Sequence, residues 1–343
     1  MCIITCDTPC YKLLGGIILL FEQNTLKNIR NKNLSDILQV LRDKGACSFS
    51  ELSEKTDGSL TTVKKCVLQG IDYGMIVEGS IADSTGGRKA KQYLINKDYQ
   101  YFLFVVVDNN DLIFKIHNFK FECVEEYFEH FNMNGFYDNI CRNIESTIKK
   151  YALGTVCLSL PCVLKDGVII DWYYNPNLND FDIKKNLEKK YNLNVIVQND
   201  MKLTVIGESI EHHPNTQDIV TIQFGHNGIG MAGMANGHLL EGYTGFAGEV
   251  GYINDLRKNI MGVSYPAKIL RNAIVFMNPQ IVVFYKSERQ NNFSQIFDTA
   301  TKGLPKYAIP KFETSDNYIG RIISGGISLI NKYGYFKKAE ENK

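Results

Sequence analysis

The first hundred residues combine three short stretches of helical periodicity with one stretch of alternation. Apolar residues at positions 34, 37, 38 and 41 share one face of a predicted helix over residues 33–45. A second helix is predicted from the cap candidate Ser50 to about Gly58, and a third from the cap candidate Ser59 through Leu68. Residues 92–96 alternate as a strand does. Three helices followed by a two-stranded hairpin is the pattern of a winged helix-turn-helix.

The third predicted helix has a polar side that suits a recognition helix, which must enter a major groove about 12 Å wide. Its polar residues are Ser59, Thr61, Thr62, Lys64 and Lys65. The apolar residues expected to seat it on the first two helices are Leu60, Val63, Val67 and Leu68. The loop over residues 84–91 adds Arg88, Lys89 and Lys91, cations suited to phosphates or a minor groove. A winged helix used only for protein contacts is the alternative.

After residue 98 apolar strands alternate with helices. Strands are predicted at 102–107, 112–118, 121–128, 155–160, 195–197 and 219–224, and helices at 137–151, 180–191, 200–208 and 264–277. This order predicts an α/β domain of two lobes with a site in the cleft between them. The expected division is an N-terminal extension over residues 1–30, a DNA-binding domain over 31–97, and a larger domain over 98–343 with lobes of about 98–198 and 199–343.

Length, composition and charge refine this picture. A chain of 343 residues is long enough for two or three folded units. Hydrophobic residues at 44% and charged residues at 22% are typical of globular proteins and exclude collagen-like, disordered and coiled-coil classes. The formal net charge of +1 shows no overall basic field, but residues 59–97 hold six lysines or arginines against three acidic residues. The basic surface is therefore local.

The longest apolar run and the cysteines bear on localisation. Leu13–Phe21 has nine residues, whereas a membrane span needs about 20. We expect it to form a short helix that packs on the body of the protein or on a second subunit. The nine cysteines include no CxxC pair, and Cys2, Cys6 and Cys10 match no common zinc spacing. A reduced, cytoplasmic protein without membrane contact and without a metal is expected.

Three segments carry a resemblance to a known family. They are VIVQNDMKLTVIGE at 195–208, IVTIQFGHNGIGMAGMANGHLLEGYTGFAGEVGYI at 219–253, and TGGRKAKQYLIN in the predicted wing. Together they resemble the ROK family of repressors, open reading frames and sugar kinases, and specifically its repressor branch. The resemblance covers about residue 25 to the end. It implies an α+β multidomain protein, in which a winged helix-turn-helix precedes a two-lobed α/β sugar-kinase-like domain of the actin/hexokinase, ribonuclease-H-like class.

The resemblance also implies a set of sugar-binding residues. In the family an Asn-Asp pair after a strand holds sugar hydroxyls, and its Asp is the general base of the kinases; here the pair is Asn199 and Asp200. An amide and a carboxylate suit a polyol even without a reaction, although such a pair is otherwise a common helix cap. Glu249 matches a sugar-contacting Glu of the family, and Tyr252 stands where members often have a His. Asn199, Asp200, Glu249 and Tyr252 are the predicted effector site.

Departures from the family pattern argue against catalysis. The first phosphate loop, residues 108–111, reads Asp-Asn-Asn-Asp and lacks the glycines that let backbone N–H groups approach phosphates. The second loop, residues 225–230, keeps glycines but is one residue longer, and the strand at 282–284 continues into Tyr-Lys-Ser-Glu without a Gly-Gly turn. The zinc loop is missing, with no cysteine after Cys162. No catalytic residue, cofactor or metal is expected, and Asp200 is a degenerate base position.

These features favour a cytoplasmic transcriptional repressor that binds an inverted-repeat operator as a homodimer or a dimer of dimers. Its larger domain would sense a sugar or a sugar derivative, because a ligand that binds two states unequally shifts the equilibrium between them. Two alternatives stay open. One is an active ROK sugar kinase with an attached DNA-binding module, and the other is a domain that binds no ligand and serves only for dimerisation.

Overall fold

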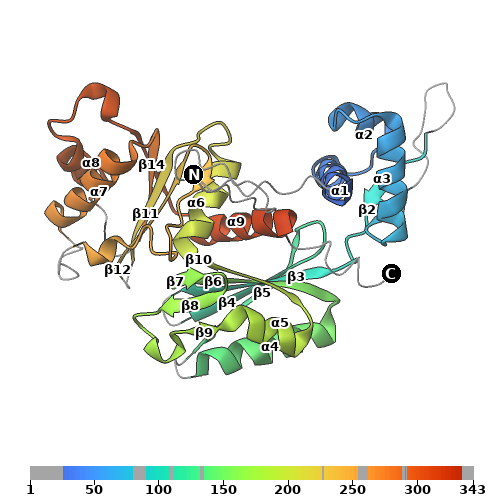
Figure 1. Ribbon diagram of the computed structural model, residues 1–343, viewed down its shortest axis with the longest axis horizontal. Coiled ribbons are helices and arrows are strands. Elements are labelled where there is room, and N and C mark those ends of the chain that lie inside the picture. The colour runs from blue at the N-terminus through green and yellow to red at the C-terminus, as the bar shows by residue number, and fades with distance from the viewer. Residues whose placement is uncertain are drawn as a thin grey trace, which may run out of the picture. The chain divides into compact units, whose positions relative to one another are not determined.

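The computed structural model describes residues 26–79, 90–108, 111–131, 135–225, 228–253, 262–287, 290 and 292–333. The chain separates into two compact units, one of residues 1–72 with 78–94 and one of residues 73–77 with 95–343. Figure 1 labels most of their elements. The predicted N-terminal extension lies almost entirely outside the described residues, as do Cys2, Cys6, Cys10, Leu13–Phe21 and most of the loop over residues 84–91.

The N-terminal unit is a group of three helices with a two-stranded sheet. Its elements are α1 (Leu26–Lys44), α2 (Phe49–Lys55), α3 (Leu60–Asp72), β1 (Ile76–Glu78) and β2 (Tyr93–Ile95). The helical periodicity is confirmed, because the predicted face of the first helix is buried: Leu34, Ile37, Leu38 and Leu41. The first helix begins at Leu26 rather than at residue 33.

Two details of this unit differ from the sequence prediction. The second helix is capped by Ser48, not Ser50: the Ser48 Oγ accepts from the Glu51 backbone N–H, and the Glu51 carboxylate accepts from the Ser48 N–H at 2.7 Å. In α3, Leu60 and Leu68 are exposed. The buried side of α3 consists of Val63, Cys66, Val67 and Gly70. These buried residues are three or four positions apart and form one narrow face of the helix. Leu60 and Leu68 lie outside this face and are therefore exposed to solvent.

The first lobe of the larger unit is a five-stranded sheet in the order β10-β6-β3-β4-β5. The strands are β3 (Tyr101–Asp108), β4 (Asp111–His117), β5 (Cys123–His130), β6 (Leu153–Leu160) and β10 (Asn194–Asn199). The first three form an antiparallel meander, and β6 and β10 run parallel to β3. A small sheet of β7 (Val163–Lys165), β8 (Val168–Asp171) and β9 (Phe181–Asp182) follows β6.

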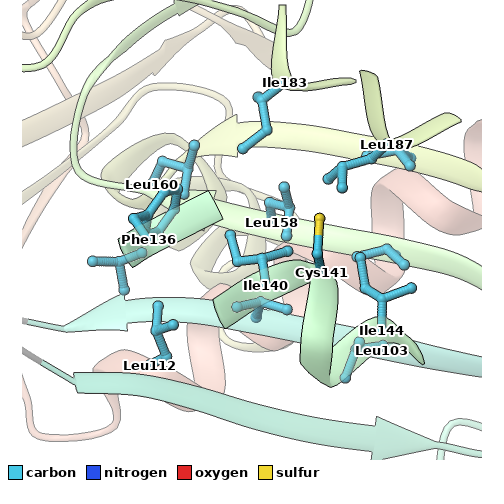
Figure 2. Packing of buried hydrophobic residues seen from close by; sticks show 14 of the residues in the cluster. Leu103, Leu112, Phe136, Ile140, Cys141, Ile144, Leu158, Leu160, Ile183 and Leu187 are labelled. Carbon is cyan, nitrogen blue, oxygen red and sulfur yellow. The ribbon is translucent and has the colours of Figure 1, made fainter. Parts of the chain in front are cut away.

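Helices α4 (Phe136–Lys150) and α5 (Ile183–Tyr191) cover one face of this first sheet. Figure 2 shows their side chains meeting the apolar residues of the strands. The labelled residues from α4 are Phe136, Ile140, Cys141 and Ile144, and those from the strands include Leu103, Leu112, Leu158 and Leu160. Each of these residues is buried, so the cluster removes a large apolar area from water.

The second lobe repeats the topology of the first. Its strands are β11 (Ile219–Gly225), β12 (Gly228–Ala235), β13 (His238–Leu239), β14 (Ile281–Tyr285) and β15 (Lys311–Ser315), in the order β13-β12-β11-β14-β15. Again the first three strands form an antiparallel meander, and the last two run parallel to the first. Helices α7 (Ser264–Met277) and α8 (Phe293–Thr301) pack on one face. The repeated order makes equivalent loops of the two lobes comparable.

Helices α6 (Asp200–Glu211) and α9 (Tyr318–Tyr333) pack on each other and join the lobes (Figure 1). Helix α9 contacts β3, β6 and β10 of the first sheet, whereas α6 contacts strands of both sheets. Two glycines permit this close approach: a Cβ on Gly207 would overlap the Arg321 carbonyl oxygen, and one on Gly325 would overlap the Leu203 carbonyl oxygen. Helix α9 therefore packs on the first lobe, although it follows the second lobe in the chain.

Candidate functional site

A cavity of about 520 Å³ lies in the larger unit where parallel strands of both sheets end. Its lining residues follow the carboxyl ends of four of these strands: Asp108 at the end of β3, Asp200 after β10, Ser287 after β14 and Asp316 after β15. Loops at the carboxyl ends of parallel strands meet at one edge of a sheet, and ligands of open α/β sheets bind there. Because the equivalent strands of both lobes end at this cavity, both lobes contribute residues to one site.

Asp200 lines this cavity from the first turn of α6. One carboxylate oxygen accepts from the Met201 backbone N–H at 2.8 Å, and the other accepts from the Tyr318 hydroxyl at 2.9 Å. Burial raises the pKa of Asp200 to about 6, and the charge of Asp108 adds to that rise, while the hydrogen bond from Tyr318 opposes it. The carboxylate is thus held in a fixed orientation at the cavity wall.

Asn199 also lines the cavity, but its side chain already serves the fold. Its Oδ1 accepts from the Lys202 backbone N–H at 3.1 Å as the N-cap of α6, and its Nδ2 donates to the Cys162 carbonyl oxygen at 3.2 Å. An amide has a second N–H and a second lone pair. Asn199 can therefore contact a ligand only through its second N–H and the second lone pair of its oxygen.

Glu249 reaches the cavity from a loop that is built on tight glycine turns. Gly245 and Gly248 have φ values of +83° and +97°, a left-handed region that favours glycine, and a Cβ at either would overlap a backbone carbonyl. Burial raises the pKa of Glu249 to about 7, and the charge of Asp200 contributes to this rise. Two carboxyl groups with raised pKa values thus face one cavity.

The buried ammonium group of Lys202 supports this loop from α6. Its Nζ donates to the Gly245 carbonyl oxygen at 2.5 Å. Burial lowers the pKa of Lys202, whereas the nearby carboxylates Glu241 and Glu249 oppose that shift. Lys202 is a residue that the sequence reasoning missed, because a lysine in the first turn of a helix gives no signal of its burial.

Tyr252, by contrast, is not among the residues that line the cavity. Its side chain is 49% exposed, its hydroxyl donates to the Asp171 carboxylate, and its ring lies 5.1 Å from that of Phe246. The structure therefore brings together Asn199, Asp200 and Glu249 and leaves the fourth predicted residue outside the cavity.

The part of the cavity near the predicted phosphate loops is polar but not basic in its described lining. Gly228 and Gly230 of β12 line it, together with Asp108, Lys286 and Ser287. The Lys286 Nζ lies 3.8 Å from an Asp316 carboxylate oxygen, so its charge is partly balanced. Asn109, Asn110, His226 and Asn227 lie outside the described residues. Among the residues that the structure describes, no group of three or more His, Cys, Asp or Glu is placed to hold a metal ion.

Tyr318 is a further cavity residue that the sequence reasoning did not identify. It is the first residue of α9 and lies more than a hundred positions from Asp200 in the chain. No local pattern links two such distant residues, so only the folded arrangement of α6 and α9 reveals the contact.

In the N-terminal unit, the predicted polar residues of α3 lie at the helix start and along one exposed side. Ser59, Thr61, Lys64 and Lys65 are exposed, and Thr62 is half-buried. Ser59 caps the helix, since its Oγ accepts from the Thr62 backbone N–H at 3.2 Å. The Lys91 Nζ lies 2.5 Å from a Glu78 carboxylate oxygen, with both side chains about half exposed. Arg88 and Lys89 lie outside the described residues.

The two lobes of equal topology, with a shared cavity at their strand ends, define a sugar-kinase-like α/β fold. Residues 133–263 match the model of the ROK family. A crystal structure of a ROK family transcriptional regulator, described as a homologue of the E. coli MLC protein, superimposes with a TM-score of 0.69 at 15% identity, covering 89% of this chain and 96% of that chain. Residues 133–263 are therefore similar to the ROK family, and the fold of the larger unit is that of ROK proteins.

Two curated relatives are repressors by name. The xylose repressor of Bacillus subtilis (strain 168) is 24% identical over 242 residues, which are 68% of this chain and 62% of the relative. The match thus spans less than two thirds of that protein. The xylose repressor of Lactiplantibacillus pentosus is 24% identical over 319 residues, covering 88% of this chain and 76% of the relative. Among the described residues, no helix is long and apolar enough to cross a membrane.

Proposed function

We propose that this protein is a transcriptional repressor whose N-terminal unit binds operator DNA and whose ROK domain binds a sugar effector. The observation that carries the proposal is the cavity at the strand ends of the ROK domain, where Asp200 and Glu249 present carboxyl groups to a ligand. The names of the curated relatives support the same assignment.

The DNA-binding part of the proposal rests on the N-terminal unit. Helices α1 to α3 followed by β1 and β2 fit a winged helix-turn-helix, with boundaries at about residues 31–97. Helix α3 would enter the major groove with Thr61, Lys64 and Lys65, which are exposed and have polar or cationic side chains. Arg88 and Lys89 would contact phosphates from the wing, while Lys91 would first have to leave Glu78.

The effector part rests on the chemistry of the cavity over the proposed domain 98–343. A carboxylate accepts hydrogen bonds from sugar hydroxyls, and Asp200 and Glu249 supply up to four acceptor oxygens. D-xylose is the first candidate because the relatives are xylose repressors. A phosphorylated or nucleotide ligand is disfavoured, since Asp108, Asp200 and Glu249 all place carboxyl groups at the cavity.

The assembly follows from the geometry of DNA. Two recognition helices must meet half-sites one helical turn apart or a multiple of it, so we propose a homodimer, or a dimer of dimers, on an inverted-repeat operator. We also propose that the protein acts in the cytoplasm, because a regulator of this kind must reach DNA. Its described cysteines are free thiols, which is typical of a reducing compartment.

A selection of bound sequences from random DNA, carried out with and without D-xylose, tests the proposal. We expect an inverted repeat to be enriched, and the recovery of bound DNA to change when D-xylose is added. The double variant Asp200→Asn with Glu249→Gln should bind the same DNA sequence but no longer respond to the sugar. Recovery of no common sequence by the wild-type protein would contradict the repressor assignment.

An active sugar kinase is the second candidate, because the cavity keeps Asp108, the base position Asp200 and the glycines Gly228 and Gly230. A coupled ATP assay over a panel of hexoses, pentoses and amino sugars distinguishes the two. We expect no turnover, and turnover that is abolished in Asp200→Asn would establish the kinase instead. A thermal-shift measurement distinguishes a pure dimerisation domain from an effector-binding domain. A bound ligand at 100 times its Kd would stabilise the folded protein by about 2.7 kcal/mol, whereas a domain that binds no ligand would show no shift.

A further inference from the structure

Tyr318 makes a hydrogen bond to the one residue that a ROK-type kinase would use as its base. The phenol hydroxyl donates to one carboxylate oxygen of Asp200 at 2.9 Å, and the other oxygen accepts from the Met201 backbone N–H at 2.8 Å. Both residues line the cavity. Each carboxylate oxygen of Asp200 therefore has a donor before any ligand enters.

The position of Tyr318 is set by a buried polar network behind it. The ring of Tyr318 packs edge to face on that of Tyr285, with centroids 5.6 Å apart. Tyr285 is fully buried and its hydroxyl donates to the Glu208 carboxylate, which also accepts from the Arg321 Nε at 3.1 Å. Two contacts therefore join α6 to the first turn of α9. Asp200 at the start of α6 accepts from Tyr318, and Glu208 near the end of α6 accepts from Arg321.

The close packing of α6 on α9 leaves little freedom for the phenol to move away. A Cβ on Gly207 or on Gly325 would overlap a carbonyl oxygen of the partner helix, so the two backbones are in direct contact. A side chain on the first residue of α9 must follow this register. The contact between Tyr318 and Asp200 is therefore a property of the helix pair rather than of one surface rotamer.

We propose that Tyr318 is a positioning residue of the effector site: its hydroxyl keeps Asp200 as a charged hydrogen-bond acceptor that is oriented at the cavity wall. A donor to a carboxylate stabilises the charged form. A sugar hydroxyl can then donate to a remaining lone pair of Asp200. This inference deepens the proposed function and rests on it, because it assigns to Tyr318 the orientation of the carboxylate that would bind the sugar.

Other ionisable groups around Asp200 act on its titration as well. The ionisable groups around it are Asp108 of β3, Cys162 after β6, Glu249 of the glycine loop and Tyr318 of α9, and Lys286 and Asp316 line the same cavity. Burial and Asp108 raise the pKa of Asp200, and Tyr318 lowers it. Removal of the Tyr318 hydroxyl should therefore raise the pKa of Asp200 further, while the other groups stay in place.

The direct test is the titration of Asp200 in the full-length protein without ligand. Carboxyl-¹³C aspartate labelling would follow the signal by NMR, and Asp200→Asn would assign it. We expect a midpoint near pH 6 in the wild type and a midpoint roughly one unit higher in Tyr318→Phe. Tyr285→Phe is the matched control: it removes a hydroxyl from the same network without touching Asp200, so the midpoint should stay near that of the wild type.

The functional arm uses D-xylose as the probe. If the pKa of Asp200 rises from about 6 to about 7, the Tyr318→Phe variant should bind D-xylose about threefold more weakly at pH 6.5 and equally well at pH 8.5. Should Tyr318→Phe fail to fold, Tyr318→Leu gives the same comparison. An unchanged Asp200 midpoint in a folded variant would overturn the inference. A raised midpoint without D-xylose binding by any variant would support it and would count against D-xylose as the effector.

Discussion

The ammonium group of Lys202 donates a hydrogen bond to the carbonyl oxygen of Gly245, 43 residues further along the chain. This contact joins the first turn of α6 to the loop that carries Glu249. Asp200 lies on the same turn of α6. The buried Lys202 therefore links the helix that carries Asp200 to the loop that carries Glu249, so that the two cavity carboxylates keep their relative positions. The arrangement of the site therefore depends on a residue that does not line it.

Replacement of Lys202 by Met should lower the free energy of unfolding by about 1–3 kcal/mol, because the Gly245 carbonyl oxygen would be left without its charged donor in a buried position. The measurement is urea unfolding of the full chain at neutral pH. The exposed Lys189 of α5 offers a matched control, and Lys189→Met should leave stability within about 0.5 kcal/mol of the wild type. Equal destabilisation of the two variants would contradict a structural role for the Lys202 side chain.

The contact of α6 with α9 leads to a second prediction. Gly207→Ala should destabilise the protein by about 1–3 kcal/mol, because the added methyl group would overlap the Arg321 carbonyl oxygen and force the helices apart. At Gly251 a Cβ has open space and φ is not positive, so Gly251→Ala is the control. Thermal unfolding of both variants checks the difference, and a Gly207→Ala protein as stable as the control would refute the tight packing of the two helices.

The raised pKa of Glu249 predicts a pH dependence of stability. The pKa is about 7 in the folded protein and near 4.5 when unfolded, so between these values the folded state binds more protons, and stability falls as pH rises through this window. Glu249→Gln stays neutral and should exceed the wild type in stability by about 1–3 kcal/mol at pH 8. Near pH 4 the gain should vanish.

Urea unfolding of wild type and Glu249→Gln at pH 4 and pH 8 checks that window. The exposed Glu54 of α2 provides the control, because Glu54→Gln should show the same small difference from wild type at both pH values. A stability difference for Glu249→Gln that does not change with pH would show that Glu249 is not held in a proton-binding environment.

The DNA-binding proposal predicts a salt effect. Replacement of Lys64 and Lys65 by Ala should weaken operator binding and reduce the slope of log affinity against log salt by about one for each lysine that pairs with a phosphate. Both side chains are exposed on α3. The variant with Lys302→Ala and Lys306→Ala, which removes two exposed lysines from the second lobe, should retain the wild-type slope. Identical slopes in all three proteins would exclude α3 as the helix that binds DNA.

Much of the secondary structure could be predicted from local patterns. Apolar residues at helical spacing identified α1 and α3, and a cap candidate identified α2. Continuous apolar runs identified β3, β6 and β11, because these strands bury one face or both faces. Helix α7 has the predicted bounds of 264–277. The cap of α2 and the exposure of Leu60 and Leu68 could not be read in this way, since both depend on how the three helices meet.

The candidate site divides along the same line. The residue types and their order are visible in the chain: Asp200 directly after a strand, Glu249 in a glycine-rich loop, and the polar start of α3. The folded arrangement was needed to see that Asp200 and Glu249 share a cavity, that Tyr252 does not line it, and that Lys202 and Tyr318 support it. The physical reason is that hydrogen bonds and burial join residues far apart in the chain, and local periodicity carries no information about such contacts.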